Sequence, residues 1–497
     1  MDIVDRPRSL PAPTALAGNR PISALAIVTC LVFTSAAAAQ STTPPATAST
    51  APSPSARPAG TEDVRSTVAR AIDWIERQTA PLPDVPEARL FVDPARRQAR
   101  LGAEIYGGSA GVLLFLENAA AVLDDGRARR LADAIALGLR ASQRLTPSEE
   151  RTWMRAGMRE GSTSLYVGDA GVGAAFLARA RLRDDAEALE LAVAIGDSIV
   201  GRGLVKDDCL SWDQQVEIIF GAAGTALFLL DLAEASGEES FVDASLAAAR
   251  WLIAEARVGS GGADGKQRRL HWVWQFGGNQ PYLNFSHGTA GVAYALARVA
   301  AVTGDEACAS AARDGAEWLL EQARPQGDGI GWPTIAGAEQ CLGGWCHGPP
   351  GTARLFLLLH AQGGEPRYLD AALAGARFVM AQAPADAPAE SAAAFPPSFC
   401  CGVAGVLDFF CDLHRVTGAA EHAAFAARAG DYLLRAAVAD GAGLKWPRGA
   451  THDPANRGGE SVDLMLGAAG EALALLRLAT LHEPRDPVRH LPDRTVR

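Results

Sequence analysis

The chain has no stretch in which lysine and arginine gather into a basic face, although it is 497 residues long. Its net charge is −11 and its pI is about 5.4. Proteins that bind nucleic acid normally present a basic surface to the phosphates, so we do not expect nucleic acid as a partner. Hydrophobic residues make up 48% of the sequence, which is typical of a soluble protein with a substantial core.

The apolar run near the N-terminus is too short to span a bilayer comfortably. Arg20 precedes "ISALAIVTCLVF", which gives way to the small residues of "TSAAAAQ". This order predicts a secretory signal over residues 1–39 and therefore an exported, periplasmic or extracellular protein; translation from a later start would leave it cytoplasmic. Residues 40–62 are rich in Pro, Ser, Thr and Ala and are predicted to form a disordered linker.

The cysteines do not form an even, regularly spaced set. Without Cys30 of the predicted signal, seven remain. An odd count with irregular spacing does not fit a disulfide framework, so it points to thiols kept for chemistry or for a metal. The seven are Cys209, Cys308, Cys341, Cys346, Cys400, Cys401 and Cys411.

An internal repeat runs through most of the chain. A Gly-x-x-Gly pair opens an apolar, helix-forming run seven times, at successive spacings of 60, 53, 67, 60, 54 and 65 residues. We expect these glycines to allow a sharp turn and a close approach between neighbouring helix starts. The first glycines of the pairs are Gly108, Gly168, Gly221, Gly288, Gly348, Gly402 and Gly467.

Seven amphipathic helical patterns alternate with these apolar runs, and strand signals are sparse. The alternation predicts one all-α domain over residues 63–483, an (α/α)7 toroid with an inner and an outer ring, followed by a tail over 484–497. All seven inner helices would then begin at one mouth of the toroid. Five aromatic residues at matching places in the outer helices are predicted to pack in the core: Trp74, Trp251, Trp318, Phe378 and Tyr432.

Repeats four to six place nearly all the metal-binding residue types directly before their glycines. These residues are His287, Cys346, His347, Cys400 and Cys401. Zinc prefers thiolate and imidazole ligands, and catalytic zinc sites use three protein ligands and keep one position open. The three thiols at matching repeat positions therefore predict a Zn²⁺ site.

The motifs "SHGTAG", "GWCHGPPG", "FCCGVAG" and "LMLGAAGEALALLRL" resemble those of the lanthionine synthetase C-like family, over roughly residues 63–483. The resemblance implies a seven-barrel α-toroid with zinc held by Cys346, Cys400 and Cys401. Cys401 stands where most members have His and is similar to a three-cysteine subset of the cyclases.

The resemblance also implies roles for two further residues. The active-site histidine of the family falls on His287, and a family Asp falls on Glu217. Leu342 replaces an Arg of the peptide cyclases, and His347 replaces a Tyr. The resulting "WCHG" looks more like the eukaryotic relatives, which resemble enzymes that add glutathione to dehydroamino acids in proteins.

A zinc site of this kind suits conjugate addition of a thiolate to dehydroalanine or dehydrobutyrine. Zinc deprotonates a thiol that is otherwise mostly protonated at neutral pH, and three cysteinate ligands keep the bound sulfur electron-rich. The resulting enolate needs a proton at carbon. We expect His287 to supply it, with His347 as the second candidate and Glu217 orienting a histidine or relaying protons.

The predicted substrate is a dehydrated peptide or a small thiol, and the protein is expected to be a monomer. Because no dehydratase domain is visible in the chain, a separate dehydratase would supply the dehydroamino acid. Two alternatives stay open. One is an α/α-toroid carbohydrate-active enzyme, which would need paired carboxylates. The other is a non-catalytic, zinc-stabilised peptide-binding protein in which Cys341 closes the site as a fourth ligand.

Overall fold

The description of the fold covers most of the chain after residue 60. The computed structural model describes residues 61–93, 96–145, 151–154, 162–262, 265, 267–386, 395–447, 460–488 and 491–493. The predicted signal and the predicted linker up to residue 60 lie outside these residues.

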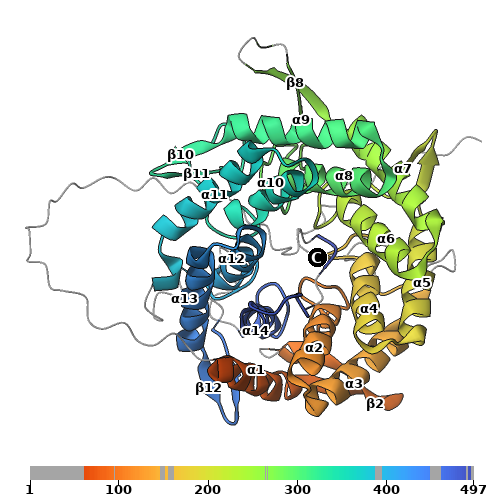
Figure 1. Cartoon of the computed structure of the whole chain (residues 1–497). Helices are drawn as coiled ribbons and strands as arrows, with labels where there is room; N and C mark the ends of the chain where they lie inside the picture. Colours follow the sequence, from red (N-terminus) through yellow and green to blue (C-terminus); the bar gives the residue numbers. More distant parts are fainter. Residues whose placement is uncertain are drawn as a thin grey trace, which may run out of the picture.

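Each of the seven glycine pairs opens a helix that is buried over most of its length. Neighbouring helices in this set pack against one another, and the last packs against the first, so they close into an inner ring (Figure 1). The inner helices are α2 (Ser109–Leu123), α4 (Asp169–Arg183), α6 (Ala222–Ser236), α8 (Thr289–Thr303), α10 (Pro349–Gly363), α12 (Val403–Thr417) and α14 (Ala468–Ala479).

In the part of the chain that the structure describes, seven amphipathic helices surround this ring. Each packs against the inner helix that precedes it, except that the first outer helix packs against α14 and so joins the two ends of the chain. The outer helices are α1 (Thr61–Glu76), α3 (Gly126–Ser142), α5 (Ala186–Gly201), α7 (Glu239–Ala254), α9 (Glu306–Gln322), α11 (Pro366–Ala381) and α13 (Ala420–Ala436). The predicted all-α (α/α)7 toroid is confirmed.

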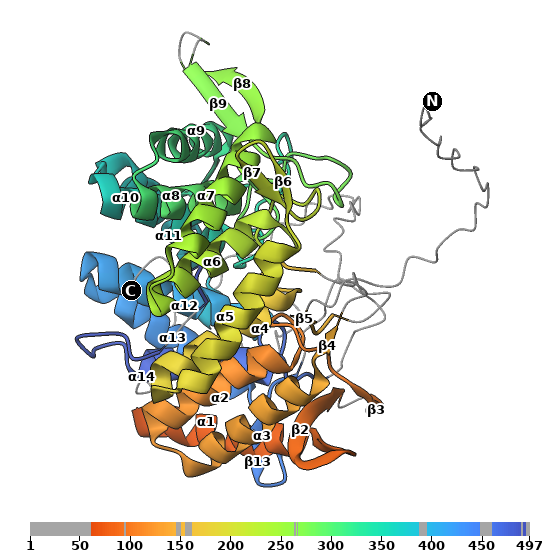
Figure 2. The same ribbon diagram turned by 90° about the vertical axis from the view of Figure 1, so that its right-hand side faces the viewer.

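Short antiparallel sheets follow six of the outer helices, and several of them lie on one side of the ring (Figure 2). The sheets are β1 (Thr79–Leu82) with β2 (Val85–Asp93) and β3 (Arg96–Arg100), β4 (Arg144–Leu145) with β5 (Arg151–Thr152), β6 (Leu204–Lys206) with β7 (Cys209–Ser211), β8 (Arg257–Gly261) with β9 (Gln267–His271), β10 (Arg324–Gln326) with β11 (Gly329–Gly331), and β12 (Val438–Asp440) with β13 (Gly443–Lys445). A 3-10 turn, η1 (Pro384–Asp386), follows α11.

A repeated tryptophan contact ties these connections to the outer helices. In five repeats an indole N–H donates to a carbonyl in the last turn of the preceding outer helix, at 2.7–2.9 Å, and so satisfies an acceptor that the helix end leaves open. The donors are Trp153, Trp212, Trp272, Trp332 and Trp446.

The second glycine of each pair is required by close packing between repeats. A Cβ at Gly171 would lie 2.3 Å from the Leu165 carbonyl oxygen and 2.7 Å from Ile105 of the preceding repeat, and the other six pairs repeat this arrangement. The first glycines have ordinary extended backbone angles, such as φ −134° at Gly168. A Cβ at Gly168 would nevertheless lie 2.3 Å from the Ser164 amide nitrogen in its own loop, so both the expected sharp turn and the expected close approach explain these glycines.

Gly171→Ala is expected to destabilise the fold by about 1–3 kcal/mol, because the added methyl group overlaps a backbone oxygen and a buried side chain. Gly363→Ala is the matched control, since a Cβ at this helical position of α10 meets nothing within 4 Å. It should leave stability unchanged or raise it slightly. Denaturant unfolding of both variants checks this; equal stabilities would contradict the packing explanation.

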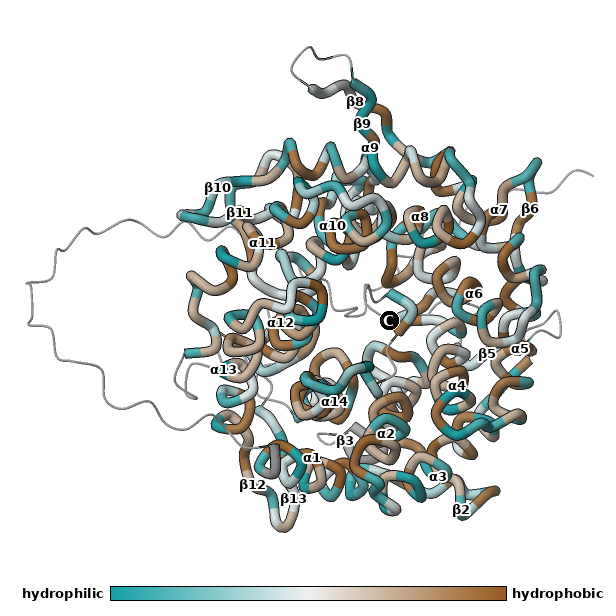
Figure 3. Tube along the Cα trace, in the orientation of Figure 1, coloured by the Kyte–Doolittle hydropathy of each residue, from teal (hydrophilic) through white to brown (hydrophobic). Residues whose placement is uncertain are grey.

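Hydrophobic residues, coloured brown in Figure 3, occur throughout both rings, and most of those in the inner helices are buried. The predicted core aromatics Trp74, Trp318, Phe378 and Tyr432 are buried, whereas Trp251 is partly exposed. Among the described residues, none of the helices combines the length and the apolarity needed to cross a bilayer.

The centre of the inner ring holds a segment from near the C-terminus. Residues 491–493, which fall in the predicted tail, lie among the inner helices (Figure 1), and we call them the axial segment. Asp493 is only 2% exposed. The domain limits of 63–483 and 484–497 stay predictions.

Candidate functional site

The loops before the inner helices are joined by a chain of backbone hydrogen bonds around the mouth. At the position two residues before the glycine pair, the amide of one repeat donates to the carbonyl of the next, at 2.8–3.3 Å. The links run from Ser286 to Cys346, from Cys346 to Cys400, from Cys400 to Met465, from Met465 to Tyr106 and from Tyr106 to Tyr166. This chain fixes the spacing of the predicted ligand loops.

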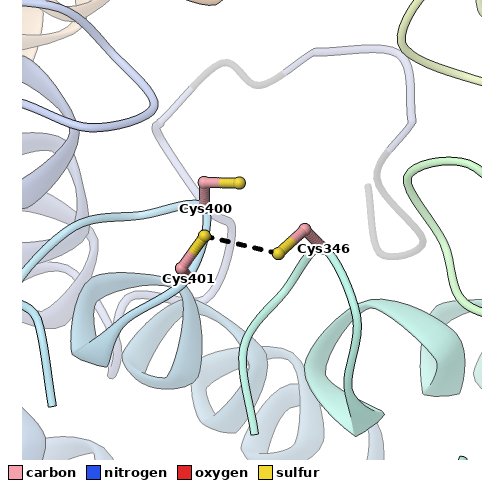
Figure 4. Close-up of side chains that lie close together, drawn as sticks. All are labelled: Cys346, Cys400 and Cys401. Carbon is pink, nitrogen blue, oxygen red and sulfur yellow. Dashed lines mark hydrogen bonds between the residues drawn. The ribbon is translucent and has the colours of Figure 1, made fainter. Parts of the chain in front are cut away.

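The three predicted zinc ligands lie together at this mouth. Cys346 stands on the loop before α10, and Cys400 and Cys401 stand on the loop before α12 (Figure 4). Their Sγ atoms all lie within 4.8 Å of one another, and those of Cys346 and Cys401 are 3.5 Å apart. Gly344 allows the approach, because a Cβ there would lie 2.9 Å from the Cys401 backbone.

The chemistry of this donor set fits a zinc ion. Zn–S bonds of about 2.3 Å place two sulfurs of a tetrahedral site about 3.8 Å apart, which is close to the spacing of these thiols. All three cysteines are free of disulfide bonds. Cys401 directly precedes Gly402, the N-cap of α12, and a helix N-terminus favours negative charge nearby. Cys346, Cys400 and Cys401 can therefore hold a metal ion.

Other thiols have different surroundings. Burial raises the pKa values of Cys308 and Cys411 to about 12, so these thiols stay protonated as core residues. Cys341 lies near β10 and β11, with its Sγ 3.7 Å from Gln326 Nε2, and it is not part of the three-thiol group. A closed four-cysteine site therefore finds no support.

His287 and Glu217 form a pair from neighbouring repeats. His287 Nδ1 lies 3.1 Å from Glu217 Oε2, and the Glu217 side chain is fully buried. Glu217 also accepts hydrogen bonds from the amides of Ile219 and Phe220, at 2.7 and 2.8 Å. The Ile219 amide occupies the position that, in five other repeats, donates to the next loop. Glu217 therefore both fixes its own loop and orients the His287 ring through Nδ1.

Two aromatic rings lie against the imidazole of His287. Trp274 stacks on the imidazole with ring centres 3.9 Å apart, and Phe220 lies parallel at 5.7 Å. Phe276, which is 48% exposed, packs edge-on against Phe220. This arrangement limits the imidazole to one orientation and gives the mouth an apolar rim.

His287 is connected to the thiols through the backbone. The Ser286 amide and hydroxyl both donate to the Cys346 carbonyl, at 3.3 and 2.9 Å. His347, which is 3% exposed, follows Cys346 directly, and its ring centre lies 5.8 Å from that of His287. The loops thus bring both predicted histidines and the three thiols to the same mouth.

The site predicted from the sequence leaves out three side chains that contact these residues. The Tyr106 hydroxyl lies 3.1 Å from Cys400 Sγ, and Trp274 and Phe220 stack against His287. Phe220 directly precedes a glycine pair, and Tyr106 stands two residues before one. Their positions in the repeat could therefore have identified them. Trp274 lies 13 residues before His287, and its contact follows from tertiary structure alone.

A cavity of about 440 Å³ borders the loops that carry Glu217 and Trp274. It is lined by Val216, Val273 and Gln275 among others. These residues directly flank Glu217 and Trp274 in the sequence.

Comparison with solved structures finds the same fold in nisin cyclase, with 16% sequence identity and a TM-score of 0.55, covering 87% of this chain and 96% of that one. A family 76 α-mannanase from Bacteroides thetaiotaomicron has 11% identity and a TM-score of 0.43, covering 84% of this chain and 95% of that one. Cellobiose 2-epimerase from Bacillus thermoamylovorans has 11% identity and a TM-score of 0.45, with coverages of 84% and 98%. A search of the curated proteins finds no match.

Residues 100–489 match the model of the family described as lanthionine synthetase C-like protein. This match spans the glycine pairs of all seven repeats, the three thiols and the His287–Glu217 pair. The chain belongs to the lanthionine synthetase C-like family.

Proposed function

We propose that the protein catalyses the zinc-dependent addition of a thiol to a dehydroalanine- or dehydrobutyrine-type acceptor, forming a thioether. The observation that carries the proposal is the meeting of three thiols with a carboxylate-oriented histidine at one mouth. Family membership and the fold of nisin cyclase support a cyclase-type enzyme.

The reaction balances without an oxidant or a reductant. The donor loses its S–H proton, its sulfur bonds to the β-carbon of the acceptor, and the α-carbon gains a proton. Zinc, when bound by Cys346, Cys400 and Cys401, would supply the stabilisation that keeps the donor sulfur anionic at neutral pH.

His287 is the proposed proton donor to the α-carbon. Glu217 holds its Nδ1, so that Nε2 is the nitrogen that transfers the proton. Trp274 and Phe220 hold the ring in place during the transfer. His347, the second histidine at the mouth, is the alternative donor.

The proposed partner is a dehydrated peptide, either as both donor and acceptor or as acceptor for a small thiol. A separate enzyme of the dehydratase class would have to make the acceptor from Ser or Thr. Export through residues 1–39 and a monomeric state remain predictions.

The test uses the purified full chain with zinc measured by elemental analysis. One synthetic peptide carries a dehydroalanine and a cysteine four residues apart, and its cyclisation is detected as lost reactivity towards N-ethylmaleimide. A second peptide carries dehydroalanine alone and is supplied with glutathione, so that addition is detected by mass. We expect about one zinc per chain and a rate above the uncatalysed reaction with at least one peptide. A protein without zinc, or one that accelerates neither reaction, would overturn the proposal.

A further inference from the structure

The axial segment is held by side chains from three different repeats. The Tyr166 hydroxyl donates to Asp493 Oδ2 at 2.8 Å, and Arg298 of α8 donates to the Pro492 carbonyl at 3.0 Å. Arg354 of α10 donates to the Asp493 carbonyl at 3.1 Å and lies 3.6 Å from its carboxylate. A segment near the end of the chain is thus bonded inside the ring rather than lying on its surface.

Arg354 connects this segment to the two helices that follow the thiols. It lies in the second turn of α10, and its Nη2 donates to Asp408 Oδ2 of α12 at 2.9 Å. Both side chains are only 4% exposed. A buried ion pair is tolerated only with good geometry and full hydrogen bonding, so it sets a narrow range of distances between the two helices.

Trp345 links Arg354 and Tyr166 to the loop that carries Cys346. Its ring lies 5.9 Å from the Arg354 guanidinium carbon and 5.4 Å from the Tyr166 ring, and the next residue is Cys346. Both of these contacts come from groups that bond Asp493. Asp493 therefore holds both side chains, Arg354 and Tyr166, that pack against Trp345 in the Cys346 loop.

We propose that the axial segment is a positioning element for the three-thiol site, in which Asp493 acts through Arg354 and Tyr166. The inference rests on the proposed zinc site. Groups that orient metal ligands are typically worth 10- to 100-fold in metal affinity, and we expect an effect of this size.

The experiment compares zinc affinity, measured by competition with a chromophoric chelator, in Asp493→Ala, Tyr166→Phe and a matched control. The control is Glu117→Ala, which removes a buried carboxylate paired with Arg179 and Arg183 between α2 and α4. Both alanine variants should lower the thermal midpoint. Of these two alanine variants, Asp493→Ala alone should weaken zinc binding, by about 10- to 100-fold, and shift the visible bands of the cobalt-substituted protein.

Tyr166→Phe removes a single hydroxyl group and should fold. It therefore tests the positioning role even if Asp493→Ala does not fold. We expect it to weaken zinc binding by about 3- to 10-fold, a smaller loss than the range for orienting groups because Arg354 still holds Asp493. Wild-type zinc affinity and cobalt bands in the variants that fold would overturn the positioning role while leaving the proposed function standing. A wild-type protein that binds no zinc would instead overturn the function itself.

Discussion

Cys346→Ser is expected to abolish stoichiometric zinc binding and, with it, thioether formation. Replacing a group that merely orients a ligand already costs about 10- to 100-fold in metal affinity, so losing one of three ligands should cost more than about 100-fold. The hydroxyl group of serine is a far poorer anionic ligand than a thiolate. Elemental analysis after dialysis, together with the two peptide assays, measures both losses.

Cys341→Ser is the matched control, because Cys341 is a partly buried thiol near the same loop but outside the three-thiol group. It should keep the zinc content and the activity of the wild type. Loss of zinc from this variant, or full zinc retention in Cys346→Ser, would contradict the assignment of the ligands. Circular dichroism of both variants separates metal loss from unfolding.

His287→Phe is expected to slow thioether formation by about 10²- to 10⁴-fold while zinc stays bound. Phenylalanine keeps an aromatic ring against Trp274 but cannot transfer a proton. In deuterated solvent the wild type should add deuterium to one face of the α-carbon. The variant should lose this facial preference, which nuclear magnetic resonance of the product detects.

Glu217→Gln separates orientation from proton transfer in the same pair. The amide can still accept a hydrogen bond from a backbone amide, but it does not stabilise a protonated imidazole. A smaller loss of rate than in His287→Phe is therefore expected. An unchanged rate in His287→Phe would move the proton-donor role to His347.

The repeat explains why so much of the ring could be predicted. Seven glycine pairs at near-regular spacing indicated seven equivalent helix starts. Cys346 and Cys400 each stand two residues before such a pair, so both were predicted to lie at the same mouth. The loop geometry confirms this, since their backbones are hydrogen-bonded to each other. The glycines were anticipated as close-approach residues for the same reason.

Contacts that do not follow the repeat could not be predicted. Trp274 reaches His287 from a connection between helices, and no periodicity fixes where such a connection folds back. Asp493 lies beyond the last glycine pair, where a short charged sequence reads as a tail. Its burial becomes explicable only when Arg354 and Tyr166 are seen to bond it inside the ring.

The closure of the ring has a consequence for biosynthesis. The Cys400 amide donates to Met465, the Met465 amide donates to Tyr106, and α1 packs against α14. When Cys401 has just emerged from the ribosome, Met465 and α14, which close the ring, are not yet available to fold. The mouth that carries the three thiols is therefore complete only after α14 has joined the ring, so we expect the proposed zinc site to reach its full affinity only in the finished polypeptide.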